Sequence, residues 1–144
     1  EEQKIVNKSL LDTDIFSEIL KAKNLNVLQN AIQYRQTFGC YSLSVITIME
    51  ITTGWQKRQQ EQKIKTLIKT ITQEEVIPVS LDIAILAGQL YADLETTGQR
   101  IGYPDCIIAA TALTNDLVLV TGNLRHYSRI FNLNYNLRLE NWRS

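Results

Sequence analysis

The sequence predicts a single α/β domain with a mainly parallel central sheet of about four or five short strands flanked by helices. Three observations predict this class. Short apolar segments alternate with amphipathic ones from one end of the chain to the other, and no repeat, low-complexity tract or linker interrupts them. The chain has 144 residues, of which 44% are hydrophobic, so one buried core is available. We expect one domain over residues 1–144, with its core at about 8–142.

The N-terminal half shows two strand-like segments that each lead into a helix. We expect a strand at 8–12, a helix capped by Asp12 or Thr13, a helix at 25–34, a strand at 40–44, a helix capped by Ser44, and a polar helix at about 56–71. Both caps are polar side chains placed directly after an apolar run, which is typical of a strand that turns into a helix.

The C-terminal half continues the alternation. We expect a strand at 76–79, a long amphipathic helix that begins at a Ser80 cap and ends at Gly98, a helix at 105–114 with Pro104 as its first helical residue, and strands at 117–120 and 137–140. Pro78 has no N–H to donate, so the 76–79 strand is expected at an edge of the sheet or to end there.

Composition excludes several functional classes. Lys and Arg together number 15, equal to Asp and Glu, so the chain is not a uniformly basic nucleic-acid protein. No apolar run approaches the ~18 residues of a membrane span, and no basic-then-apolar leader opens the sequence. Cys40 and Cys106 form no motif, which favours a reducing cytoplasm. His126 is the only histidine, so any chemistry must come from carboxylates.

The positive charges are unevenly distributed. Residues 55–72 contain five cations and one acid, and residues 117–144 contain four cations and one acid. Ordinary solvated helix faces explain either segment alone. Together they permit a polyanion to dock on a neutral protein, because binding follows the local field.

Three acids and one amide are expected at the same edge of the sheet. Asp12 and Asn123 follow strands, whereas Glu50 and Asp105 lie in helices packed beside them. Carboxylates gathered in one cleft repel each other unless a cation compensates them, and Mg²⁺ or Mn²⁺ supplies that charge. Such an ion activates water for attack on a phosphodiester.

Each acid also has an ordinary structural explanation. Asp12 can be a helix cap, Glu50 can point to solvent, and Asp105 can complement a helix dipole. Spacing alone gives only a weak case for a joint site.

Five segments resemble the PIN-domain nucleases, and among them the VapC-type toxins of bacterial toxin–antitoxin pairs. LLDTDI at 10–15 resembles the opening LLDT[ND]-I, and SVITIME at 44–50 resembles S-x-x-T-x-x-E. DCIIAATA at 105–112 is similar to D-x-x-IAA-x-A, LVTGNLRHY at 119–127 to LVT-x-N-x-x-[DH]-[FY], and LENW at 139–142 to the closing strand. The matches follow the family's order over essentially the whole chain.

The resemblance implies a Mg²⁺-dependent endoribonuclease, with Mn²⁺ as an alternative ion. It implies Asp12, Glu50 and Asp105 as metal ligands, and Asn123 as the fourth catalytic position, where some members carry Asp. His126 occupies a nearby place often held by an acid. The residues implied to orient the acids are Thr13, Asp14, Ser44, Thr47 and Thr121.

The same resemblance implies three partners: an RNA substrate, commonly transfer RNA, a second copy of the chain, and a cognate antitoxin. Arg100, Arg125 and Arg129 are candidates for phosphate contacts because they lie near the motif segments.

Two alternatives remain open at this point. One is a PIN-like module that binds nucleic acid or an antitoxin through a degraded metal site, and Asn123 favours it. The other is a phosphohydrolase with Asp12 as nucleophile and Asp14 as acid, because the two have D-x-D spacing.

Overall fold

A computed structural model describes residues 5–144 of the chain. Within this range the strands are β1 (Ser9–Leu11), β2 (Ser42–Ser44), β3 (Glu75–Ile77), β4 (Val118–Val120) and β5 (Leu139–Glu140). The helices are α1 (Thr13–Lys21), α2 (Leu25–Phe38), α3 (Val45–Lys57), α4 (Glu61–Ile71), α5 (Leu81–Thr96), α6 (Tyr103–Thr114) and α7 (Leu124–Phe131). The predicted α/β class is confirmed.

The five described strands form one parallel sheet in the order β3-β2-β1-β4-β5. The order reverses direction between β1 and β4, so a crevice forms beyond the carboxyl ends of these two strands. Asp12 directly follows β1, and Thr121 directly follows β4. The topology alone therefore brings these two polar residues together.

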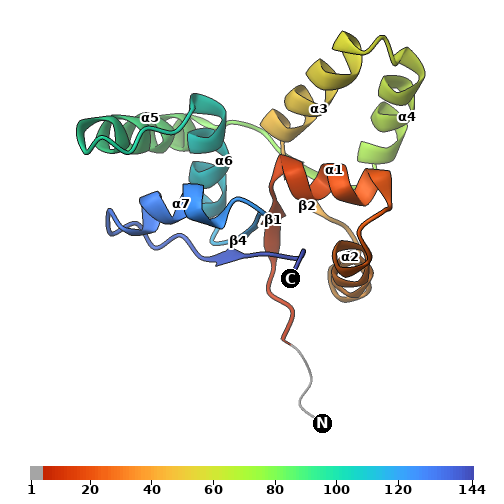
Figure 1. The fold of residues 1–144 in the computed structure, drawn as a ribbon, viewed down its shortest axis with the longest axis horizontal. Helices are drawn as coiled ribbons and strands as arrows, with labels where there is room; N and C mark the ends of the chain where they lie inside the picture. The colour runs from red at the N-terminus through yellow and green to blue at the C-terminus, as the bar shows by residue number, and fades with distance from the viewer. Residues whose placement is uncertain (1–4) are drawn as a thin grey trace.

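The sheet separates two apolar cores. Leu10 and Leu119 pack with residues of α5, α6 and α7, whereas their neighbours Leu11 and Val120 pack with residues of α1, α2 and α3. Successive strand residues point to opposite faces, which explains why the strands are apolar on both sides. Figure 1 shows the corresponding arrangement, with α5–α7 on one side of the central strands and α1–α4 on the other.

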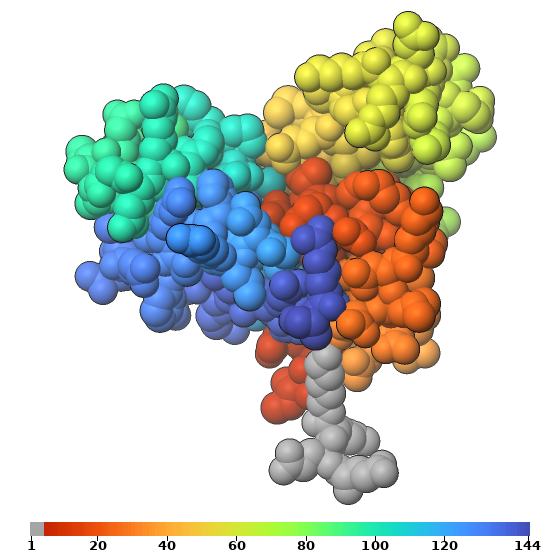
Figure 2. All heavy atoms as spheres, in the orientation of Figure 1, coloured from red at the N-terminus to blue at the C-terminus, as the bar shows by residue number. Residues whose placement is uncertain are grey.

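The surface is hollowed at the carboxyl edge of the sheet. In Figure 2 the residues of α5 and α6 (teal) and those of α3 and α4 (yellow) rise on either side of a notch, and α1 (red) lies at its base. Among residues 5–144, no helix combines the length and the apolar character needed to cross a bilayer.

The local start signals predicted from the sequence are confirmed. Asp12 caps α1 by accepting from the Thr13 N–H, Ser44 caps α3 by accepting from Ile46, and Ser80 caps α5 by accepting from Ile83. The strand that precedes Pro78 lies at an edge of the sheet, as expected.

Several element predictions need correction. Helix α2 extends four residues beyond the predicted end at Tyr34, β2 covers only Ser42–Ser44 of the predicted 40–44, and α6 begins at Tyr103, so Pro104 is its second residue. The helix expected at 56–71 is the end of α3 and a separate α4, because Gln59 adopts a left-handed φ of 57° between them. Helix α7 was not predicted; it has only eight residues, of which Tyr127 and Ile130 are buried. The last strand covers only Leu139–Glu140 of the expected 137–140.

Candidate active site

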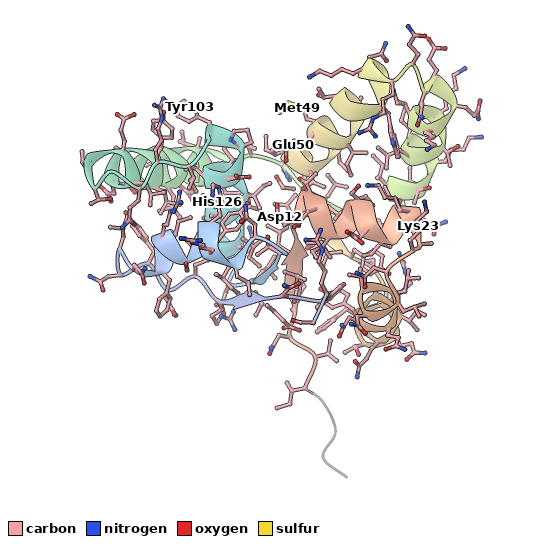
Figure 3. The ribbon with its side chains drawn as sticks, viewed as in Figure 1. Asp12, Lys23, Met49, Glu50, Tyr103 and His126 are labelled. Atoms are coloured by element: carbon pink, nitrogen blue, oxygen red, sulfur yellow. The ribbon has the colours of Figure 1, made fainter. Side chains whose placement is uncertain are left out.

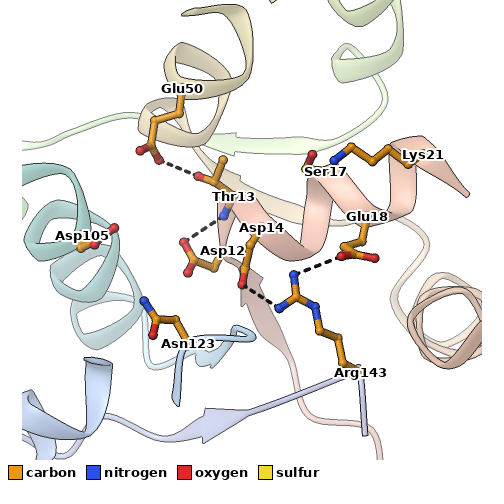
Figure 4. A pocket seen from close by; sticks show the side chains of 10 residues that line it. All are labelled: Asp12, Thr13, Asp14, Ser17, Glu18, Lys21, Glu50, Asp105, Asn123 and Arg143. Atoms are coloured by element: carbon orange, nitrogen blue, oxygen red, sulfur yellow. Dashed lines mark hydrogen bonds and ion pairs between the residues drawn. The ribbon is translucent and has the colours of Figure 1, made fainter. Parts of the chain in front are cut away.

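A pocket of about 440 Å³ opens beyond the carboxyl ends of β1 and β4 (Figure 4). It is lined by Asp12, Thr13, Asp14, Ser17, Glu18, Lys21, Glu50, Asp105, Asn123 and Arg143. The four residues predicted to be catalytic, which come from four separate segments of the chain, all lie in this lining.

Asp12 lies deepest in the pocket and is only 6% exposed. Its Oδ1 accepts from the Thr13 N–H at 2.9 Å and its Oδ2 from the Thr121 hydroxyl at 2.8 Å. Burial, reinforced by the negative charges of Asp14 and Asp105, raises the pKa of Asp12 to about 7. Asp12 is thus the cap of α1 and also a buried acid whose ionised form is disfavoured.

Glu50 points into the pocket from α3. The Thr13 hydroxyl lies 2.6 Å from Glu50 Oε1 and donates to it, and the Thr47 hydroxyl lies 3.1 Å from that of Thr13. Figure 4 shows this link between α1 and α3. The first residue of α1 therefore positions the acid of α3.

Asp105 is held by two side chains of α7. The Tyr127 hydroxyl donates to Asp105 Oδ1 at 3.1 Å and also lies 3.4 Å from Asp12 Oδ1. His126 Nε2 lies 2.8 Å from Asp105 Oδ2. The carboxylates of Asp12 and Asp105 are therefore close enough to share one buried hydroxyl, and Figure 3 shows His126 and Asp12 facing the same region.

Asp14 ties the loop after β4 to α1. Its Oδ2 accepts from the Gly122 N–H at 2.9 Å, its Oδ1 accepts from Ile15, and Arg143 Nη1 lies 3.7 Å away. Burial raises the pKa of Asp14 although these donors and the Arg143 charge oppose the rise. Arg143 also pairs with Glu18 at 3.1 Å, so the end of the chain closes this wall of the pocket.

Asn123 lines the pocket in a different way. Its backbone N–H donates to the Thr121 hydroxyl at 3.0 Å, but its side chain makes no capping hydrogen bond to α7 and the residue is exposed. Its amide is therefore placed by the backbone and free to turn.

The donor set of the pocket fits a hard divalent cation. Five carboxylates and two cations line it, a formal charge of −3. Carboxylate, amide and hydroxyl oxygens are the ligands that Mg²⁺ and Mn²⁺ prefer. An anionic substrate approaching this charge needs a compensating cation.

The carboxylates line one pocket, but their oxygens do not point to one common position. Among residues 5–144, no three His, Cys, Asp or Glu side chains are arranged to hold one ion. Thr13 engages Glu50, and His126 and Tyr127 engage Asp105, so the oxygens are turned toward protein donors. Mg²⁺ is usually bound by one or two carboxylates and several waters, which this arrangement allows.

The other residues singled out in the sequence fall into two groups. Thr13, Thr47 and Thr121 contact the acids directly or through one hydroxyl, whereas Asp14 accepts from the backbone of Ile15 and Gly122. The Ser44 hydroxyl caps α3. The lining of the pocket does not include Arg100, Arg125 or Arg129. Arg129 instead donates to the backbone carbonyl of Arg100 at 3.3 Å, which joins these two arginines beside α6.

Sequence reasoning missed Tyr127 and the pair Glu18 and Arg143. Tyr127 belongs to the 119–127 segment that resembles a family motif, but the sequence did not predict that its hydroxyl contacts Asp105 and Asp12. No local signal marks the role of Arg143, because its ion pairs are with residues more than 100 positions earlier.

The basic segment at 55–72 borders a second groove of about 320 Å³. Trp55 and Leu67 contribute apolar surface, Arg58 and Lys63 contribute charge, and no described residue that lines it is acidic. The groove shares Ser17 and Lys21 with the acidic pocket, so the two lie next to each other.

Comparison with known proteins gives consistent matches over nearly the whole chain. A family model described as PIN domain matches residues 9–131. Ribonuclease VapC2 of Haemophilus influenzae is 31% identical over 136 residues, which cover 94% of this chain and 98% of that protein. The tRNA(fMet)-specific endonuclease VapC of Shigella flexneri is 29% identical over the same shares of the two chains.

Solved structures with a similar fold come from toxin–antitoxin complexes. The chain superimposes on one from DNA-bound VapBC of Salmonella typhimurium with a TM-score of 0.79 and 30% identity, covering 95% of this chain and 99% of that one. A chain from VapBC2 of Rickettsia felis, bound to a promoter DNA fragment, gives a TM-score of 0.78 and 28% identity, with 93% and 98% covered.

Proposed function

The chain belongs to the PIN domain family, and from this premise we propose that it is the toxin endoribonuclease of a toxin–antitoxin pair. Its reaction is the hydrolysis of RNA phosphodiesters with a divalent metal ion. The predicted resemblance to VapC-type nucleases is confirmed by the curated relatives. The observation that carries the catalytic proposal is the placement of Asp12, Glu50 and Asp105 in one pocket.

In this proposal Asp12, Glu50 and Asp105 hold Mg²⁺ or Mn²⁺, and Asn123 completes the catalytic set. A bound divalent cation lowers the pKa of a water and neutralises charge that develops on the phosphodiester. Thr121 fixes one Asp12 oxygen and Thr13 fixes one Glu50 oxygen, so these hydroxyls orient the acids. The Tyr127 hydroxyl holds Asp105 beside Asp12.

We further propose transfer RNA as the substrate class and a cognate antitoxin as the protein partner. Support for the substrate comes from the relative named as a tRNA(fMet)-specific endonuclease. Support for the antitoxin comes from the VapBC complexes with the same fold. We also propose a homodimer, as the family resemblance implies, acting in the cytoplasm on RNA; sedimentation of the purified chain tests the dimer.

The decisive experiment incubates the purified protein with total RNA in Mg²⁺, and in parallel with EDTA. We expect cleavage only with the metal, leaving 5′-phosphate and 3′-hydroxyl ends. Asp12→Ala is expected to abolish cleavage. Asp116→Ala is the matched control, because that acid has a 97% exposed side chain and does not line the pocket. Full cleavage by Asp12→Ala, or in EDTA, contradicts the proposal.

The second candidate is a binding module without strong catalysis. The exposed, unfixed Asn123 side chain favours it, since this is the fourth position of the set. Binding of RNA without any metal-dependent cleavage in the same assay supports this alternative. The phosphohydrolase hypothesis receives no such support, because the relatives named above are ribonucleases.

A further inference from the structure

Two tyrosines form a parallel stack on the outer surface beside the active site. Tyr91 of α5 and Tyr103 of α6 have ring centroids 3.9 Å apart and planes inclined by 10°. Tyr103 is 59% exposed, and Figure 3 shows it at the end of α6 that borders the hollow. One face of the Tyr103 ring thus packs on Tyr91, and much of the remaining ring surface meets water.

The exposed Tyr103 ring takes no part in the hydrophobic core. The buried residues of α6 pack between the sheet and α5, but the Tyr103 ring lies outside that cluster. An aromatic ring held in a fixed orientation and left exposed is the form of a stacking platform, because a planar ligand gains contact there without ordering a mobile side chain.

One arginine contacts the stack, and a second arginine contacts the first. Arg100 Nε donates to the Tyr91 hydroxyl at 3.1 Å, and its guanidinium carbon lies 5.9 Å from the Tyr91 ring centroid. The Arg100 side chain is 70% exposed, and its backbone carbonyl accepts from Arg129. Glu95, 3.9 Å from Arg100 and exposed, is the facing acid. The surface therefore combines a fixed ring with two positive charges and one negative charge.

The stack lies at the start of the helix that carries Asp105 of the catalytic pocket. Tyr103 and Asp105 both belong to the first turn of α6. Arg129 belongs to α7, whose His126 contacts the Asp105 carboxylate. A strand of nucleic acid with its phosphate at Asp105 therefore has its neighbouring nucleotides within reach of this surface.

We propose that Tyr103, backed by Tyr91, stacks an unpaired base of the RNA substrate next to the cleaved phosphodiester, while Arg100 and Arg129 contact the adjoining phosphate. This inference rests on the proposed ribonuclease function. Single-stranded RNA is bound in this way, through bases stacked on aromatic rings and cations along the backbone. It assigns Arg100 and Arg129 a shared role and leaves Arg125 outside it.

The test separates binding from cleavage. A short fluorescein-labelled single-stranded RNA is titrated into Asp12→Asn protein, with and without Tyr103→Ala, and fluorescence anisotropy gives the dissociation constant. Loss of one stacked base weakens binding roughly tenfold or more. Tyr103→Leu keeps the apolar contact with Tyr91 and is expected to bind as weakly as the Ala variant. Tyr103→Phe and Tyr103→Trp are expected to bind like the parent.

Phe131→Ala is the matched control. Phe131 is a 55% exposed aromatic residue on α7 whose ring lines a different pocket, with Leu137 and Arg138. Its removal is expected to leave RNA binding unchanged. In the cleaving protein, Tyr103→Ala is expected to raise KM about tenfold with little change in kcat, and thermal melting checks that the fold persists.

Three results overturn the inference. Tyr103→Ala binding RNA within twofold of the control contradicts it while leaving ribonuclease activity intact. So does a shift in oligomeric state caused by Tyr103→Ala without a change in RNA affinity, which identifies the surface as a contact between copies. Parent protein that binds no RNA also overturns it, whereas parent protein that binds RNA through Tyr103 but cleaves none contradicts only the proposed function.

Discussion

Asp12 and Asn123 line the same pocket, but the fold supports them very differently. Asp12 is 6% exposed and both of its oxygens accept hydrogen bonds. Asn123 is exposed, and its side chain makes no capping hydrogen bond. One side of the pocket is therefore organised before any metal or substrate arrives, and the other is not. The consequences of substitution should follow this gradient.

The largest effect expected is on stability, at Asp12. Its pKa is raised from 3.8 to about 7 by burial and neighbouring acids. Between pH 4 and 7 the folded state keeps a proton that the unfolded chain releases, so the free energy of unfolding falls as pH rises through that window. Asp12→Asn cannot ionise, so it avoids the loss of stability that the parent undergoes as Asp12 becomes charged. The substitution should raise the free energy of unfolding of metal-free protein at pH 8 by about 2–4 kcal/mol.

Urea unfolding in EDTA at pH 8 and at pH 4 measures this difference. The two proteins should be nearly equal at the lower pH, where Asp12 is protonated in the folded state. Mg²⁺ at pH 8 should stabilise the parent and leave Asp12→Asn unchanged. A difference that does not vary with pH would show that the Asp12 charge is not the cause.

A smaller loss, in catalysis, is expected when the hydroxyl that supports Glu50 is removed. Thr13→Val keeps the shape of the side chain but deletes the donor that lies 2.6 Å from Glu50 Oε1. Removal of a group that orients a metal ligand costs roughly 10–100-fold in metal affinity or activity. Cleavage rates against Mg²⁺ concentration measure it. Thr53→Val is the control, because that exposed hydroxyl on α3 bonds only to the Met49 carbonyl; equal losses in both variants contradict the role of Thr13.

Gly122 joins the two sides of the pocket, and its substitution should cost less. A Cβ at this position would meet the Arg143 guanidinium and Asp14 Oδ2. Because Arg143 is a long side chain that can move away, Gly122→Ala should lower the free energy of unfolding by only about 1 kcal/mol. Thermal melting measures it. If Arg143→Ala is made first, the added cost of Gly122→Ala should shrink; an unchanged cost would mean that Asp14, which the Cβ also meets, is what resists the methyl group.

The sequence could predict features that depend on neighbouring residues, but not those that depend on contacts between distant segments. The caps at Asp12, Ser44 and Ser80 depend on neighbouring residues, and all three were predictable. The approach of Asp12 to Asp105 depends on the strand order, which spacing did not give; the family resemblance implied only that the two acids belong to one site. Arg143 depends on contacts with Asp14 and Glu18 that no pattern in its own segment announces.

The smallest effect is expected at Asn123, the less supported of the two residues compared above. Because the structure fixes its backbone and not its amide, Asn123→Ala should lower cleavage less than tenfold, which corresponds to under about 1.4 kcal/mol. Asn123→Asp adds a carboxylate to a pocket that already carries five, and should raise divalent-metal affinity while lowering the stability of the metal-free protein. Isothermal titration with Mn²⁺ and melting in EDTA measure both changes. A loss from Asn123→Ala as large as that from Thr13→Val would mean that substrate binding orders this side chain, and that the second half of the site is completed only in the complex with RNA.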